Sequence, residues 1–163
     1  MRVAYAAVLL TIVPLLAGEA GFDDHYYYRL TNSYLGEGYS LDSTAVGNLV
    51  PQMAQSSASA GQYWKFTAWG GCFRIGNVLL GSGYALDNSN SGTHPPVMAA
   101  AGNYSGQCWQ IGPEHDGYVR LTNAYLGNSH SLDTYSNGKH LPFMAETGTA
   151  TGQYWKLIRL SRQ

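Results

Sequence analysis

A six-residue phrase that begins Gly-Gln and carries Trp at its fourth position occurs three times in this chain of 163 residues. The copies are Gly61–Phe66, Gly106–Ile111 and Gly152–Leu157. They lie about 45 residues apart, a period typical of proteins built from internal repeats. Because a unit of this length encloses no core of its own, we expect three units to share one core.

Three other phrases recur in every unit, always in the same order. The opening phrase ends in Asn, at Tyr28–Asn32, Phe73–Asn77 and Val119–Asn123. The next ends in Leu-Asp, at Tyr39–Asp42, Tyr84–Asp87 and His130–Asp133. The third runs from Pro to Met-Ala, at Pro51–Ala54, Pro96–Ala99 and Pro142–Ala145. These phrases divide the chain into repeats at about residues 26–68, 71–113 and 117–160, which we call units one, two and three.

Each phrase has the composition of a short strand and is followed by turn residues. In unit one the expected strands are Tyr26–Leu30, Tyr39–Asp42, Pro51–Ala54 and Gln62–Phe66. No amphipathic helix pattern appears after the first twenty residues. The sequence therefore predicts an all-β protein with four strands in each unit.

Three four-stranded units favour one closed architecture. A β-propeller has blades of this length but needs at least about four of them. A closed barrel removes the sheet edges and gives the units a common core. We therefore expect a β-trefoil, a six-stranded barrel capped by three hairpins, with the Leu of each Leu-Asp pair and the Trp of each Gln-x-Trp filling its interior.

The three Gln-x-Trp phrases, with an Asp ending the second strand of each unit, resemble the ricin B-chain type trefoil lectins and related carbohydrate-binding modules. The resemblance spans about residues 26 to 160. It implies a β-trefoil fold and carbohydrate binding. Two features depart from the family: its stacking aromatic ring is matched here by Ala54, Ala99 and Ala145, and its Asn before Gln-x-Trp by Gly61, Gly106 and Gly152.

The first twenty residues differ in kind from the rest. Arg2 precedes the apolar run Val3–Val13, which is followed by Pro14 and the small residues Ala17, Gly18 and Ala20. This pattern is typical of a secretory signal peptide, and the run is too short for a membrane span. We expect a signal peptide at residues 1–20 and a single domain at 21–163, which makes the protein secreted and extracellular.

The two cysteines, Cys72 and Cys108, both lie in unit two. The equivalent positions of the other units hold Tyr27, Tyr63, Tyr118 and Tyr154. Because unit two replaces both members of the pair, we expect the two positions to face each other and to form a Cys72–Cys108 disulfide, as secreted proteins commonly do. Two buried free thiols are the alternative.

The repeated Asp residues are the first candidates for ligand contact. A carboxylate at a strand end accepts two hydrogen bonds, which suits adjacent sugar hydroxyls, and the matching Asp contacts the sugar in the resembled family. An Asp there also caps the following turn in many proteins. The candidate carbohydrate-binding residues are Asp133, Tyr135, Asn137 and His140 in unit three, Asp42, Asn48 and Gln52 in unit one, and Asp87, Asn88 and Tyr104 in unit two.

Unit three has the loop richest in polar and aromatic side chains, and we expect it to bind best. The Gln-x-Trp residues are expected to be structural, with Gln holding a loop and Trp in the core. They are Gln62, Trp64, Gln107, Trp109, Gln153 and Trp155. Asn103 begins an Asn-Tyr-Ser triplet, a possible site of N-glycosylation.

Other functions have little support. The formal net charge of −1 disfavours nucleic-acid binding, which needs a basic surface. No Gly-x-Ser-x-Gly phrase or helical His pair indicates catalysis or a metal, and no cofactor is expected. We therefore predict a non-enzymatic lectin that binds glycans or glycoproteins. A secreted trefoil that binds a protein partner, with degenerate sugar sites, is the alternative.

Overall fold

The computed structural model describes residues 25–47, 49–88, 95–113, 116–134 and 140–160. Unit one contains β1 (Tyr27–Asn32), β2 (Tyr39–Asp42), β3 (Gln52–Gln55), the short 3-10 helix η1 (Ala60–Gln62) and β4 (Trp64–Trp69). Unit two contains β5 (Cys72–Asn77), β6 (Tyr84–Asp87), β7 (Val97–Ala100), η2 (Ser105–Gln107) and β8 (Trp109–Pro113). Unit three contains β9 (Val119–Asn123), β10 (His130–Thr134), β11 (Pro142–Glu146), η3 (Thr151–Gln153) and β12 (Trp155–Leu160).

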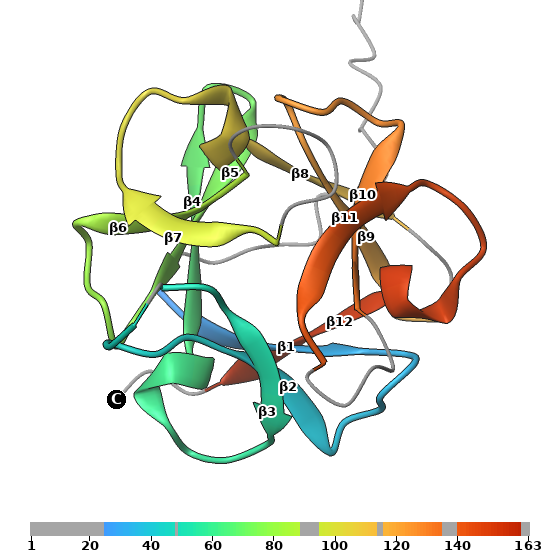
Figure 1. The fold of residues 1–163 in the computed structure, drawn as a ribbon, viewed down its shortest axis with the longest axis horizontal. Helices are drawn as coiled ribbons and strands as arrows, with labels where there is room; N and C mark the ends of the chain where they lie inside the picture. The colour runs from blue at the N-terminus through green and yellow to red at the C-terminus, as the bar shows by residue number, and fades with distance from the viewer. Residues whose placement is uncertain (1–24, 48, 89–94, 114–115, 135–139, 161–163) are drawn as a thin grey trace, which may run out of the picture.

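The first and last strands of every unit form a closed barrel in the order β1-β12-β9-β8-β5-β4. The second and third strands pair as the hairpins β2-β3, β6-β7 and β10-β11. Figure 1 shows these hairpins arranged around a common centre above the barrel. The β-trefoil expected from the repeats is thus confirmed.

The fourth strand of each unit begins two residues later than the sequence predicts. In unit one it starts at Trp64, because Gln62 lies in η1. The cap residue Ser59 accepts a hydrogen bond from the Gly61 backbone N–H and starts this tight turn. The turn directs the Gln62 side chain towards the hairpin, which a continuous strand with alternating side chains does not allow.

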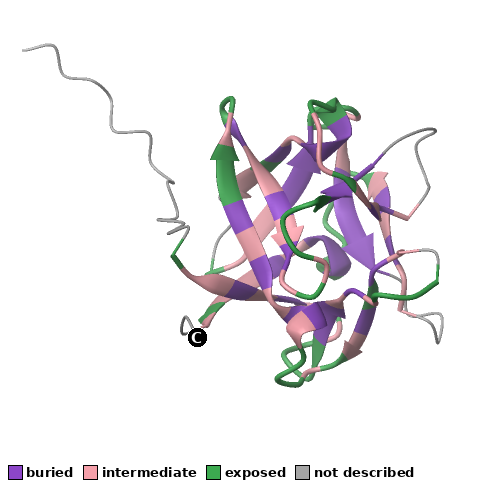
Figure 2. Ribbon diagram, turned by 90° about the vertical axis from the view of Figure 1, so that its left-hand side faces the viewer, coloured by how far each residue is buried: buried purple, intermediate pink, exposed green. Residues whose placement is uncertain are grey.

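The shared core consists of equivalent residues from all three units. Trp64, Trp109 and Trp155 have no exposed surface, and Leu41, Leu86 and Leu132 are also buried. A Met from the third strand of each unit completes the set: Met53, Met98 and Met144. Figure 2 shows that buried residues follow the strands, whereas exposed residues gather mainly in the loops. Burial of these apolar side chains is the main free-energy gain on folding.

The Asn that ends each opening phrase ties one unit to the next. Asn77 donates from its side chain to the Gly61 carbonyl of unit one at 2.8 Å, and its Oδ1 accepts from the Leu79 N–H. Asn32 and Asn123 make the corresponding bonds to Gly152 and Gly106. Each unit is therefore joined to its neighbour, and the chain of contacts closes around the barrel.

The Cys72–Cys108 disulfide is present, with the two Cα atoms 5.4 Å apart. It joins β5 to the residue before β8, two strands that pair at Phe73 and Trp109. In unit one the equivalent Tyr27 and Tyr63 rings stack with centroids 6.4 Å apart. The same cross-strand position therefore holds a covalent bond in one unit and an aromatic contact in another.

Replacing both cysteines by alanine should lower the free energy of unfolding by about 4 kcal/mol, because the bond closes a 36-residue separation in the unfolded chain. Urea denaturation of the oxidised protein measures this loss. The matched variant Cys72→Tyr with Cys108→Tyr copies the ring pair of unit one and should recover part of it. Equal stability of the alanine variant and the wild type would contradict the prediction.

Within the described residues, no helix has the length and apolar character needed to cross a lipid bilayer.

Candidate functional site

The Gln of each Gln-x-Trp phrase is buried between its hairpin and the loop before it. In unit two, Gln107 Nε2 donates to Asp87 Oδ2 at 3.0 Å and to the Ala100 carbonyl at 2.8 Å. Its Oε1 accepts from the Gly102 N–H at 2.9 Å. The equivalent pairs are Gln62 with Asp42 and Gln153 with Asp133. All units thus hold the Asp carboxylate and the loop in one fixed arrangement.

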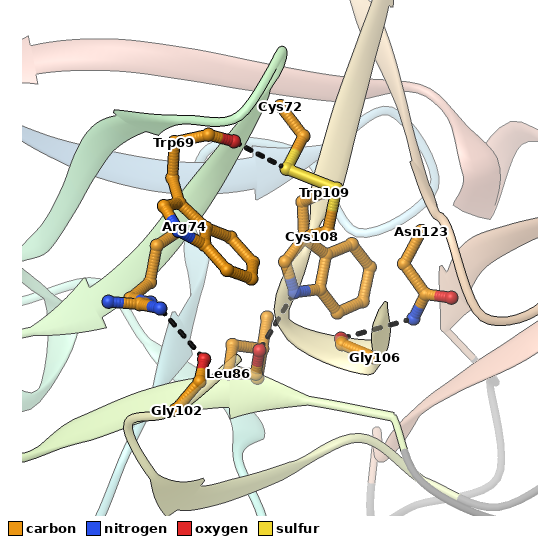
Figure 3. The surroundings of a disulfide bond; sticks show 9 residues. All are labelled: Trp69, Cys72, Arg74, Leu86, Gly102, Gly106, Cys108, Trp109 and Asn123. Atoms are coloured by element: carbon orange, nitrogen blue, oxygen red, sulfur yellow. Dashed lines mark hydrogen bonds between the residues drawn. A yellow bond between two sulfur atoms is a disulfide. The ribbon is translucent and has the colours of Figure 1, made fainter. Parts of the chain in front are cut away.

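The loop from Gly102 to Gly106 is held at both ends (Figure 3). Arg74 donates to the Gly102 carbonyl at 2.7 Å, and Asn123 of unit three donates to the Gly106 carbonyl. In the same view, the Trp109 indole N–H donates to the Leu86 carbonyl at 2.8 Å. Tyr104, in the middle of this loop, is therefore presented from a rigid base.

The Gly before each Gln-x-Trp makes room for the Asp carboxylate. A Cβ built on Gly106 would lie 2.1 Å from Asp87 Oδ1, and one on Gly152 would lie 2.1 Å from Asp133 Oδ1. Gly61 stands in the same relation to Asp42, at 2.2 Å. A larger residue at this position would displace the carboxylate. The departure from the family's Asn thus has a packing reason that acts in all three units.

The carboxylate oxygens are used differently in units two and three. Asp133 Oδ1 accepts from the Thr134 N–H at 2.7 Å and Oδ2 from Gln153, so both oxygens are engaged. Asp87 Oδ2 accepts from Gln107, whereas its buried Oδ1 has no hydrogen-bond partner among the described residues. Asp87 therefore keeps one acceptor for another donor.

A pocket of about 480 Å³ lies beside Asp87. Asn88 also lines it; this side chain is 1% exposed, and neither of its polar atoms has a partner in the described part of the chain. At the rim stand Tyr104 and Tyr125, which are 60% and 47% exposed. Buried amides normally have hydrogen-bond partners, so these atoms hold unused hydrogen-bonding capacity among the described residues, which a polar ligand reaches only if the loop around them shifts.

The Tyr104 ring lies against the backbone of its own loop. A Cβ on Gly102 would meet the ring at 2.4 Å, so the ring packs over a position that only glycine leaves open. Tyr125 approaches from the turn after β9 in unit three. The two exposed rings therefore come from different units and flank the polar floor formed by Asp87 and Asn88.

The other two units lack this combination at the aligned positions that the structure describes. Ser43 and Thr134 replace Asn88, and Ser59 and Ala150 replace Tyr104. Leu79 and Tyr34 are the exposed counterparts of Tyr125. Unit two alone among them thus combines an amide, a free carboxylate oxygen and two rings.

The structure brings only some of the predicted site residues together. Asp87, Asn88 and Tyr104 come together in the unit-two pocket, and Asn103, at the predicted glycosylation triplet, also lines it. Gln52 is exposed and lies opposite Asp42 in the β2-β3 register, while the His140 ring packs 5.3 Å from Tyr39 of unit one. Asn48, Tyr135 and Asn137 lie outside the described residues, as does most of the loop that favoured unit three.

Sequence reasoning missed Tyr125 and Ser105, which also line the pocket. Tyr125 follows the opening phrase of unit three, where Tyr34 and Leu79 stand in the other units. A large aromatic or aliphatic residue in the turn at all three equivalent positions was the signal that the sequence offered. The sequence does not show that such a residue lines the pocket of the preceding unit, because this depends on how the units pack.

In the described part of the chain, no group of three or more His, Cys, Asp or Glu side chains is arranged to hold a metal ion.

The closed barrel, its three hairpins and the repeated Gln–Asp contacts define a β-trefoil protein. A model of the ricin-type beta-trefoil lectin domain-like family matches residues 60–154, more than half of the chain. The protein therefore belongs to this family. A search of curated proteins found no match.

Several solved structures share the fold. The designed three-fold symmetric protein ThreeFoil has a TM-score of 0.71 and 22% identity, over 82% of this chain and 99% of that one. The Macrolepiota procera ricin B-like lectin in complex with lactose has a TM-score of 0.70 and 16% identity, over 85% of this chain and 98% of that one. An exo-β-1,3-galactanase from Clostridium thermocellum has a TM-score of 0.69 and 24% identity; 85% of this chain matches 31% of that enzyme.

The pKa of Asp133 should lie above its ordinary value of 3.8, because burial of the carboxylate outweighs the hydrogen bonds from Gln153 and Thr134 and the charge of Arg120. The folded protein then holds this proton to higher pH than the unfolded chain does. This group alone therefore lowers the free energy of unfolding as pH rises from 3.8 through the folded pKa.

A titration of the Asp133 carboxyl carbon by NMR measures that pKa. Urea denaturation across the same pH range measures how the free energy of unfolding changes with pH. The difference between the wild type and Asp133→Asn is the part that this carboxyl contributes. A carboxyl that titrates at or below 3.8 would contradict the prediction.

Proposed function

We propose that this protein is a secreted, non-catalytic carbohydrate-binding protein and that the unit-two pocket is a working sugar site. Asp87 Oδ1 and the Asn88 amide, buried without partners among the described residues beneath two exposed tyrosines, are the observation that carries the proposal. Membership in the ricin-type lectin-like family supports it. The lactose complex of the similar Macrolepiota procera lectin also favours a saccharide ligand.

A sugar has the groups that this pocket requires. Its hydroxyls donate to Asp87 Oδ1 and the Asn88 oxygen, and one hydroxyl oxygen accepts from the Asn88 NH₂. Its C–H face packs on an aromatic ring, here Tyr104 or Tyr125 in place of the family's ring on the third strand. The pocket is open and buries little area, so a single site binds weakly.

The side chains around the pocket are suited to binding a glycan rather than to cleaving a glycosidic bond. Cleavage of a glycosidic bond by the usual route needs two carboxyl groups placed across it, and Asp87 is the single carboxylate that lines the pocket among the described residues. That carboxylate also holds Gln107 in the loop. We therefore infer a protein that recognises a glycan and leaves it intact.

Asn88→Ser should weaken sugar binding without lowering stability. It removes both amide contacts, which should weaken binding at least about tenfold. It breaks no internal hydrogen bond of the described chain, and unit one carries Ser43 at this position. A glycan array with neutral saccharides finds a ligand, calorimetry then compares the variant, and thermal melting checks the fold.

Two ring variants make a matched pair. Tyr125→Ala should weaken binding, whereas Tyr34→Ala, which removes an equally exposed ring at the equivalent position of another unit, should retain it. Loss in both variants would contradict a site in unit two. Folded wild-type protein that binds no saccharide on a broad array would overturn the proposal and favour a protein partner.

Secretion is the second part of the proposal. The disulfide and the apolar segment Val3–Val13 support export to an oxidising compartment. Protein secreted by a eukaryotic host should begin at Gly21, as mass spectrometry measures. In that host a glycan on the exposed Asn103 should add mass that Asn103→Gln lacks and should cover the pocket. An intact N-terminus at Met1 would contradict signal-peptide cleavage.

A further inference from the structure

A second hollow lies on the barrel wall between β4 and β5, with a volume of about 430 Å³. Lys65, Arg74 and the rings of Tyr27 and Tyr84 line it, together with Ser82. None of its lining residues lines the unit-two pocket, and none is acidic. We call this hollow the β4-β5 groove. Its two cations and lack of carboxylates make it electropositive.

One of the two cations that line the groove has no side-chain partner among the described residues. Lys65 is half-buried and makes no ion pair or hydrogen bond with the described residues. Arg74 is already committed, because its guanidinium lies 4.4 Å from the Trp69 ring and donates to the Gly102 carbonyl. The Lys65 ammonium is therefore the group in the groove that is free to meet an anion.

At the equivalent place on the barrel wall, between β12 and β1, such a lysine has a partner. Lys156 occupies the position of Lys65, and Glu37 occupies the position of Ser82. The register supports this match, since Lys156 pairs with Thr31 and Lys65 with the aligned Gly76. Lys156 forms an ion pair with the Glu37 carboxylate, which raises the pKa of Lys156.

The third equivalent place, between β8 and β9, has neither the lysine nor the glutamate, although Arg120 lines the hollow there. Gln110 replaces the lysine and Asn128 replaces the glutamate, and both line a hollow there. At these two aligned positions the three units thus have a lysine with its carboxylate, a neutral pair, and a lysine without a carboxylate among the described residues. The β4-β5 groove is the unmatched case, with a place for a negatively charged group that none of the described residues supplies.

We propose that the β4-β5 groove binds the sulfate or carboxylate group of an acidic saccharide, with Lys65 as its counter-ion. The anion takes the place that the Glu37 carboxylate holds beside Lys156. The exposed Tyr84 ring and the Tyr27 ring flank the sugar that carries the anion. That the anion comes on a saccharide rests on the proposed function; that the groove takes an anion does not.

The test uses NMR titration of the isotope-labelled protein with inorganic sulfate, galactose 6-sulfate, glucuronic acid and galactose. The acidic sugars should shift the amide signals of Gly76 and Gly81, which line the groove, and galactose should not. Higher ionic strength should weaken these shifts. Stronger binding of galactose 6-sulfate than of inorganic sulfate identifies a saccharide as the source of the anion. Equal binding of the two would overturn the saccharide part of the proposal.

Point variants test whether a loss of binding comes from the groove itself or from misfolding. Lys65→Met should weaken binding of galactose 6-sulfate about tenfold or more. Ser82→Glu keeps Lys65 but supplies the missing carboxylate, and it should block the groove to the same extent. Lys156→Met is the matched control and should leave binding unchanged. Thermal melting checks that each variant is folded.

Glu37→Ser is the converse experiment. It frees Lys156 and should create a second anion site, seen as new shifts at Gly36. The proposal is overturned if Lys65→Met binds as the wild type does, or if Glu37→Ser gains no site. Shifts of the Asn88 and Tyr104 amides without groove shifts would leave the proposed sugar site intact and reject this one. Sulfated probes that shift the groove signals but not the pocket signals would support the anion site and reject the proposed sugar site.

Discussion

The buried amide of Gln107, repeated as Gln62 and Gln153, is the contact on which the rest of the structure depends. It holds an Asp carboxylate, a hairpin carbonyl and a loop N–H at once, so one side chain joins three segments of a unit. A buried amide that lost one partner would leave a costly unpaired group. The preceding glycine follows from this contact, because a Cβ there would collide with the carboxylate.

The units are similar in skeleton but different in surface. The Trp, Leu and Met positions of the core are repeated, and the opening-phrase Asn residues link each unit to its neighbour. Positions outside this skeleton are free to differ, because no shared packing constrains them. Asn88 with Tyr104 in one unit, and Ser82 in place of Glu37 beside a lysine, are differences of this kind.

The structure also separates two roles of the repeated Asp. In every unit the Asp carboxylate accepts a hydrogen bond from the Gln side chain, so the threefold recurrence of Asp by itself indicates a structural role. In unit two Oδ1 is left without a partner among the described residues, next to an amide in the same condition. A binding role is therefore inferred from unused hydrogen-bonding capacity in one unit rather than from the threefold pattern.

The sequence alone determined the β-trefoil and the disulfide, because both follow from patterns that repeat along the chain: strand phrases at a fixed period, and a paired exchange of Tyr for Cys. The tertiary structure decided which side chains meet. Tyr125 of unit three stands over the pocket of unit two, and His140 packs on Tyr39 of unit one. Such contacts cross unit boundaries, and whether a polar atom is paired depends on burial and distance, which a linear pattern does not carry.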